Sequence, residues 1–320
     1  MIVLISDTPV AGTVDRLGQW IEKISGIKTI TLVKRNYPHH AFELKSGVFG
    51  CLPNWENYIA SIISQANCII LHNVLDEKVI NIVFKEKRKN TNVLYQLHSP
   101  PLEGPQFTYE VISKYKFDGI LSVSQGHGRF IKNSISVPNI VPDFNLNNGP
   151  EKEDIIFIPH IRTTNFKWSN KFSPANAKEL DNGKKFFKST RVSTIKELFG
   201  RDIVSHSEIQ FALQFCSFVV DDINTGLIHQ TAIEGLKAGC GVFSGADMYT
   251  IEEYSETIDA PEPPFIYVDN MDEVVKFLIT SNGRDYLKSK GEEINSYSKK
   301  YLSEERVANK YFEKVVKYIC

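Results

Sequence analysis

The sequence has few of the features that mark secreted, membrane-spanning or DNA-binding proteins. Its five cysteines are dispersed without a CxxC pair, which argues against a disulfide framework and a structural zinc site. No apolar run approaches the length of a membrane span, and the opening MIVLISDTPV lacks the basic start of a signal peptide. The net charge is −1, so the chain lacks the excess of basic side chains that duplex DNA binders use to replace the counterions of the phosphates. We therefore expect a cytoplasmic protein that does not bind duplex nucleic acid, while a peripheral membrane contact stays open.

The chain is long enough for two domains, since it has 320 residues, of which 42% are hydrophobic and 23% charged. Short apolar runs alternate with amphipathic segments, a pattern typical of parallel sheets flanked by helices. The pattern stops at the polar stretch Pro142–Asp154 and then restarts, so this stretch reads as a linker. The sequence predicts an α/β protein with one domain over residues 1–148 and a second over 149–301. No GxGxxG follows the strands expected at Ile2–Ser6 and Ile155–Ile158, which argues against a dehydrogenase.

Several helix and strand ends are indicated by single residues. A helix over Thr231–Ala238 should stop at Gly239, because glycine adopts the left-handed conformation that ends many helices. A strand is expected at Gly241–Ser244. Residues 283–318 read as almost wholly helical, with a break near 301–303. Cys68 and Cys216 lie in apolar runs and should be buried.

The segment Phe218–Gly245 (FVVDDINTGLIHQTAIEGLKAGCGVFSG) carries a resemblance to a known family. It resembles the donor-binding stretch of GT-B glycosyltransferases, in particular the retaining family 4, in which a glycine-bearing loop precedes a helix with glutamate and small residues. FDGILSVS at residues 117–124 and SVPNIVPDF at 136–144 resemble other parts of that family in the same order. One feature departs from it. The family places a second glutamate eight positions before the one matching Glu234, and Gly226 stands there.

The resemblance implies two Rossmann-like domains facing across a cleft, with a closing helix at about residues 302–320 that crosses back to the first domain. It also implies an enzyme that moves a sugar from a nucleoside diphosphate sugar to an acceptor, here unidentified, without a metal ion or any cofactor besides that co-substrate. The donor would bind the second domain and the acceptor the first.

Candidate donor-binding residues follow the strand at Phe218–Val220. The resemblance gives Glu234 the role of accepting hydrogen bonds from ribose hydroxyls, which suits a carboxylate because it offers only acceptors. Alternatively, Glu234 is an exposed acid that complements the helix dipole. The loop residues Asn224, Thr225 and Gly226 precede the helix, where backbone amides can hold a diphosphate, although a plain turn would look the same.

Basic side chains are needed to offset the charge on the leaving diphosphate when no metal does so. Arg162 and Lys167 follow the strand expected at Ile155–Ile158, and the resemblance makes them phosphate-binding residues; a guanidinium suits two phosphate oxygens at once. The carboxylates of Asp221 and Asp222 could bind a metal ion, but two adjacent acidic residues at a strand end most often lie in a solvated turn. We assign no metal ligand.

Candidate residues in the first domain lie where strands end. His98 follows the apolar run Val93–Leu97, and the resemblance places a histidine there near the transferred sugar. Its imidazole could bind a sugar hydroxyl or carry a proton near neutral pH, or serve a purely structural role. Gly12 and Thr13, after the first strand, are candidates to line the acceptor side.

Other functions remain compatible with these residues. A glycosyltransferase acting on modified DNA bases would need a basic face on the first domain. A sugar-nucleotide epimerase would need more acid and base groups than His98 and Glu234. A catalytically silent binding subunit would tolerate the absent second glutamate.

Overall fold

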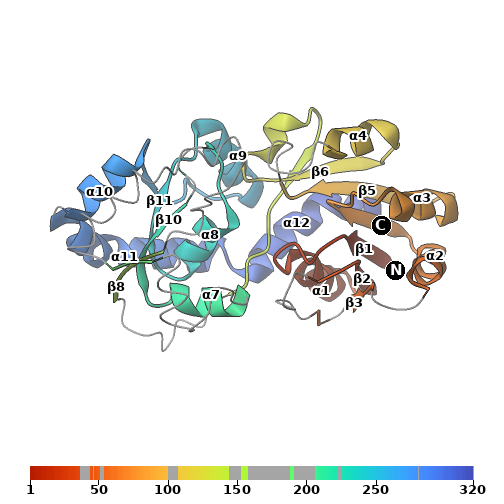
Figure 1. The fold of residues 1–320 in the computed structure, drawn as a ribbon, viewed down its shortest axis with the longest axis horizontal. Coiled ribbons are helices and arrows are strands. Elements are labelled where there is room, and N and C mark those ends of the chain that lie inside the picture. Colours follow the sequence, from red (N-terminus) through yellow and green to blue (C-terminus); the bar gives the residue numbers. More distant parts are fainter. Residues whose placement is uncertain are drawn as a thin grey trace. The chain divides into compact units, whose positions relative to one another are not determined.

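A computed structural model describes residues 1–36, 44–45, 47–50, 54–99, 107–143, 153–157, 188–190, 206–221, 223, 225–279 and 281–319. The chain divides into two compact units. Unit 1 comprises Met1–Ile140 and Glu305–Cys320, and unit 2 comprises Val141–Glu304. Each unit is built around a parallel sheet with helices on both faces (Figure 1).

The sheet of unit 1 has seven parallel strands in the order β3-β2-β1-β4-β5-β6-β7. Their bounds are β1 Ile2–Ser6, β2 Thr29–Val33, β3 Gly47–Phe49, β4 Cys68–His72, β5 Asn92–Leu97, β6 Gly119–Val123 and β7 Ile135–Val137. The strand order runs outward from β1 on one side and from β4 on the other. In open α/β sheets of this kind, ligands bind beyond the carboxyl ends of the strands at the point where the order reverses.

Helices cover both faces of this sheet because its central strands are apolar on both sides. The helices are α1 Thr13–Ser25, α2 Trp55–Ile63, α3 Glu77–Glu86, α4 Phe107–Lys114, the 3-10 helix η2 His127–Phe130 and α12 Glu304–Ile319. Residues of α1 and α12 pack on Ile2 and Leu4, whereas α2 and α3 pack on Val3 and Ile5. The C-terminal helix α12 is therefore part of the core of unit 1 (Figure 1).

The sheet of unit 2 has five parallel strands in the order β12-β11-β10-β8-β9. The strands are β8 Glu153–Phe157, β9 Lys188–Thr190, β10 Cys216–Val220, β11 Gly241–Ser244 and β12 Ile266–Tyr267. The helices are α7 His206–Leu213, α8 Gln230–Lys237, α9 Met248–Ile258, α10 Met271–Ile279 and α11 Ser281–Tyr301. One face of the sheet packs on α8, α9 and α11, and the other on α10.

Most local expectations agree with the structure. Gly239 has a φ of 74°, β11 spans Gly241–Ser244, and α11 and α12 are separated at residues 302–303. Cys68 and Cys216 are buried. The short strand β3 was not expected, because two apolar side chains, Val48 and Phe49, are too short a run to identify a strand. Of the helices described, none is long and apolar enough to cross a membrane.

Candidate functional site

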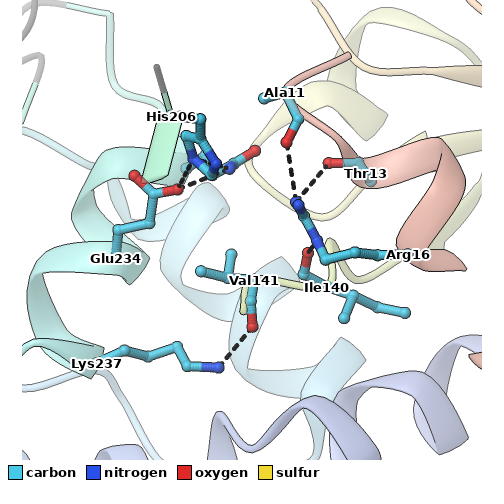
Figure 2. A network of polar contacts seen from close by, with 9 residues as sticks. Ala11, Thr13, Arg16, Ile140, Val141, His206, Glu234 and Lys237 are labelled. Carbon is cyan, nitrogen blue, oxygen red and sulfur yellow. Dashed lines mark hydrogen bonds and ion pairs between the residues drawn. The ribbon is translucent and has the colours of Figure 1, made fainter. Parts of the chain in front are cut away.

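Glu234 lies on α8, which follows β10 at the carboxyl edge of the second sheet. The residue is only 3% exposed, so the interpretation as an exposed helix acid is wrong. Its Oε1 is 2.6 Å from Nε2 of His206 on α7 and accepts from Nε2 of Gln230 at 2.8 Å (Figure 2). Within the described part of the chain, the hydrogen bonds to this carboxylate all end on Oε1. Oε2 is the oxygen left to accept from a ligand.

The loop before α8 is fixed against the N-terminus of α9. The carbonyl oxygen of Gly226 accepts from the backbone N–H of Asp247 at 3.1 Å and from Oγ1 of Thr250 at 2.6 Å. Thr225 is half-buried, and its Oγ1 accepts from the Leu227 N–H at 3.4 Å, a long hydrogen bond. Thr225 and Gly226 thus lie in a tightly held loop leading into α8.

Replacing Gly226 with alanine should lower the free energy of unfolding of unit 2 by about 1–2 kcal/mol. Its φ of 72° is left-handed, and an added Cβ would lie 2.7 Å from Oδ2 of Asp247. Gly291→Ala in α11 is the matched control, because a Cβ there meets nothing within 4 Å and alanine favours a helix interior. Urea unfolding monitored by tryptophan fluorescence and circular dichroism would test this. Equal stability of the Gly226→Ala variant and the wild type would contradict it.

Asp221 is fully buried, so the interpretation of Asp221 and Asp222 as a solvated turn is wrong for Asp221. Its Oδ2 accepts from the backbone N–H of His229, the residue that caps α8, at 3.0 Å, and its Oδ1 is 3.4 Å from Nδ1 of His229. Asp221 therefore fixes the start of α8. Among the described residues, no group of three His, Cys, Asp or Glu side chains is arranged to hold a metal ion.

Lys237, the last residue of α8, is buried with its ammonium group fully engaged. Nζ donates to the carbonyl oxygen of Val141 at 2.6 Å (Figure 2). It also donates to the carbonyl oxygen of Leu302 at 2.9 Å and to Oδ1 of Asp143 at 2.6 Å. Asp143 and Glu304 also bond through their backbone N–H groups and carboxylates. Lys237 thus joins the first and last segments of unit 2. The remaining donor-binding candidates, Arg162, Lys167 and Asn224, lie outside the described residues.

In unit 1, Gly12 and Thr13 lie in the connection between β1 and α1. Val10, Ala11 and Gly12 have φ angles of 49°, 52° and 74°, a run of left-handed residues that is costly and often found at functional sites. Thr13 is buried, and Arg16 donates to its Oγ1 at 3.4 Å, to the Ala11 carbonyl at 3.0 Å and to the Ile140 carbonyl at 3.2 Å (Figure 2). Arg16 therefore stabilises this connection from within unit 1.

His98 follows β5 and is held by two residues that follow or end β4. Nε2 of His98 is 2.8 Å from Nδ1 of His72, and the backbone N–H of His98 donates to Oδ1 of Asn73 at 3.0 Å. Burial, and then the charge of His127, lower the pKa of His98 to about 3; burial and His98 keep the pKa of His72 well below its usual range. Because a general base works best with a pKa near the working pH, His98 is better suited to hydrogen bonding than to taking up a proton.

These lowered pKa values predict that unit 1 loses stability in mild acid. An unfolded histidine binds a proton near pH 6.5, whereas His72 and His98 stay neutral in the folded chain well below that pH. The two histidines therefore do not lower the free energy of unfolding above pH 6.5. Below that pH, each of them lowers it by about 1.4 kcal/mol for each pH unit. Urea midpoints measured between pH 7 and pH 5 should fall, and His72→Phe should flatten the dependence. If the urea midpoints of the wild type and His72→Phe changed equally with pH, the prediction would be contradicted.

Comparisons with known proteins give structural matches alone. No protein-family model matches the sequence, and no curated protein matches it significantly. A glycosyltransferase from Rickettsia africae ESF-5 has a TM-score of 0.61 at 15% identity, covering 99% of this chain and 98% of that chain. The Anabaena protein HepE in complex with UDP-glucose has a TM-score of 0.66 at 10% identity, covering 99% of this chain and 100% of the other. The chain has the GT-B fold.

A further GT-B match is an alpha-glucosyltransferase in complex with UDP and a 13-mer DNA containing an HMU base. Its TM-score is 0.65 at 13% identity, and the match covers 98% of both chains. Two parts of the fold class expected from the sequence are confirmed: the two Rossmann-like α/β units, and the C-terminal helix that returns to the first unit. At identities this low the matches establish the fold, and the roles of single residues need a separate argument.

Sequence reasoning missed residues that hold the candidate site together. His206 is the first residue of α7, and no pattern in the sequence points to its partner Glu234, 28 positions later. His72 is the last residue of an apolar strand and His98 directly follows the next one, and these similar positions were a usable signal. The sequence gives no sign of the role of Lys237, because only the tertiary structure brings the carbonyls of Val141 and Leu302 to it.

Proposed function

We propose that this GT-B protein is a glycosyltransferase that moves a sugar from a uridine diphosphate sugar to an acceptor hydroxyl, without a metal ion. The observation that carries the proposal is Glu234 on α8, a buried carboxylate whose hydrogen bonds to other described residues are all made by Oε1. Oε2 can then accept from a ribose hydroxyl of the donor. HepE and the alpha-glucosyltransferase are both described in complex with UDP, which supports uridine as the nucleotide.

The proposal assigns the diphosphate to the loop Thr225–Gly226 and the N-terminus of α8, where backbone N–H groups favour an anion. Arg162 and Lys167 would balance its charge as the bond between the anomeric carbon and the diphosphate oxygen breaks. The acceptor oxygen bonds to that carbon and releases its proton to solvent. His98 holds a hydroxyl of the transferred sugar, and Gly12 and Thr13 lie on the acceptor side.

The test uses the purified full-length chain with UDP-, GDP- and TDP-sugars. A UDP-sugar at about 100 times its Kd should stabilise the protein by about 2.7 kcal/mol, which raises the melting temperature of a unit of this size by about 5–10 °C. The same donor should release UDP slowly by hydrolysis, also in the presence of EDTA. The absence of any thermal shift and any UDP release with all donors would overturn the proposal.

The acceptor can be a saccharide or a modified base in DNA. The second class is favoured by the likeness to the alpha-glucosyltransferase, whose structure contains DNA with an HMU base. An assay that offers both acceptors together with a UDP-sugar radiolabelled in its sugar separates them. Label transferred to the DNA identifies the base as the acceptor, and label transferred to the saccharide identifies the saccharide. Binding of UDP without transfer to either class or to water would favour a silent binding subunit.

A further inference from the structure

Two histidines lie side by side at the carboxyl ends of β4 and β5 in the first sheet, next to the point between β1 and β4 where the strand order reverses. His72 is the last residue of β4 and pairs in register with Ser6 on β1 and Gln96 on β5. His98 lies two positions after Gln96, and its Nε2 is 2.8 Å from Nδ1 of His72. The rings are tilted by 33° with centroids 5.1 Å apart. The pair thus lies at the edge of the sheet where a ligand of this fold is expected.

The chemistry of imidazole makes the two rings act as one unit. A neutral ring has one N–H and one acceptor nitrogen, and a single proton lies between Nδ1 of His72 and Nε2 of His98. If His72 donates that proton, the outer nitrogen of His98, Nδ1, carries an N–H; if His98 donates it, Nδ1 is an acceptor. The state of His72 therefore decides what His98 offers to a ligand.

The two outer nitrogens are buried and, among the described residues, have no hydrogen-bond partner. His72 itself is 0% exposed and lies under α1 and α12, on the same sheet face as Gln96, which accepts from the Tyr311 hydroxyl of α12 at 2.6 Å. His72 is thus enclosed by the core and can affect a substrate only through His98. His98 is half-buried, and its backbone is fixed by Asn73.

We propose that His72 is a positioning residue that holds the ring of His98 in one orientation and one tautomer, so that this half-buried ring meets the transferred sugar in a single, fixed way. The assignment rests on the proposed function for its consequence in catalysis, but not for the coupling of the two rings. Both rings are neutral because burial disfavours their charged forms, so tautomer and not charge is the property that His72 controls.

The direct test is the ring-nitrogen NMR spectrum of the full chain labelled with ¹⁵N-histidine, with His98→Asn to assign the signals. Wild-type His98 should show one pyrrole-like and one pyridine-like nitrogen, as a single neutral tautomer does. His72→Phe keeps a ring of similar size and removes both nitrogens, so the His98 shifts should move toward the average of two tautomers. Unchanged His98 shifts in His72→Phe would overturn the proposal.

The functional test measures kcat and KM with the nucleotide sugar that the protein is found to use among the UDP-, GDP- and TDP-sugars. His72→Phe should lower kcat about 5- to 10-fold, the effect of one misplaced hydrogen bond, while KM for the donor changes less than about twofold. His72→Asn carries a polar atom where Nδ1 was and should recover kcat to within about threefold of wild type. A purely structural role would not show this recovery.

Tyr95→Phe is the matched control. Tyr95 follows Leu94 on β5, faces the opposite side of the sheet, and donates from its buried hydroxyl to the Val74 carbonyl at 3.0 Å. The variant loses one buried hydrogen bond in the same strand pair and should leave the His98 shifts and kcat unchanged. An equal fall of kcat in Tyr95→Phe and His72→Phe would overturn the proposal. If no donor is turned over but His72→Phe shifts the His98 nitrogens, the proposed function falls and the control of His98 by His72 stands.

Discussion

Replacing Glu234 with glutamine should weaken the binding of UDP by about 10- to 100-fold, the equivalent of one hydrogen bond to a charged group. The single amide oxygen can still accept from His206 and Gln230, which now bond to Oε1. The amide nitrogen then takes the place of Oε2 and offers a donor where ribose hydroxyls need an acceptor. Isothermal titration calorimetry with UDP would measure the loss.

The control for this substitution is Glu304→Gln. Glu304 is also a carboxylate of unit 2 with a structural hydrogen bond, in which its Oε1 accepts from the Asp143 N–H at 2.8 Å. Its Kd for UDP should match that of the wild type within about twofold. Similar melting temperatures for Glu234→Gln and wild type would show that the fold is intact. Unchanged UDP binding in Glu234→Gln would remove Glu234 from the donor site.

Replacing Lys237 with methionine should destabilise unit 2 by about 3 kcal/mol, at the lower end of the cost of breaking a buried charged network. Methionine retains most of the apolar stem but leaves the carbonyls of Val141 and Leu302 without their donor. Because Asp143 is half exposed, water can solvate its carboxylate and limit the loss. The melting temperature should fall by about 6–12 °C.

Differential scanning calorimetry would measure this fall, with Lys290→Met as the control. Lys290 lies on α11 of the same unit, is half exposed, and pairs with Glu293 at 2.7 Å on the surface. Such a pair contributes about 0–1 kcal/mol, so its loss should hardly change the transition. Equal transitions for both lysine variants would show that the three hydrogen bonds of Lys237 contribute nothing to the stability of unit 2.

Much of the fold could be predicted because it follows from short-range patterns. The buried strands β1, β4 and β10 are continuous apolar runs bounded by polar residues, and such runs identify parallel strands without knowledge of their neighbours. Gly239 ended its helix as predicted because the left-handed conformation is a property of one residue. The strand β3 was missed because its three residues are too few for an apolar run to be recognised.

The candidate site was predictable only in part. The sequence located Glu234 and His98 after their strands, because the carboxyl ends of parallel strands share one edge of a sheet. It gave no sign that Glu234 is buried against His206, 28 positions earlier, or that Asp221 is buried beneath the start of α8. Whether an acid is solvated or paired depends on which segments pack around it.

The sequence by itself determined the alternation of strands and helices, their main boundaries and the restart of the pattern in a second α/β unit, since these depend on local periodicity and on the conformations of single residues. Tertiary structure decided the strand order and, through it, which polar side chains meet. His72 and His98 are 26 positions apart and become partners because β4 and β5 lie side by side in parallel register. Lys237 reaches Val141, 96 positions away, because the packing of α8 closes the first and last segments of unit 2 around one buried ammonium group.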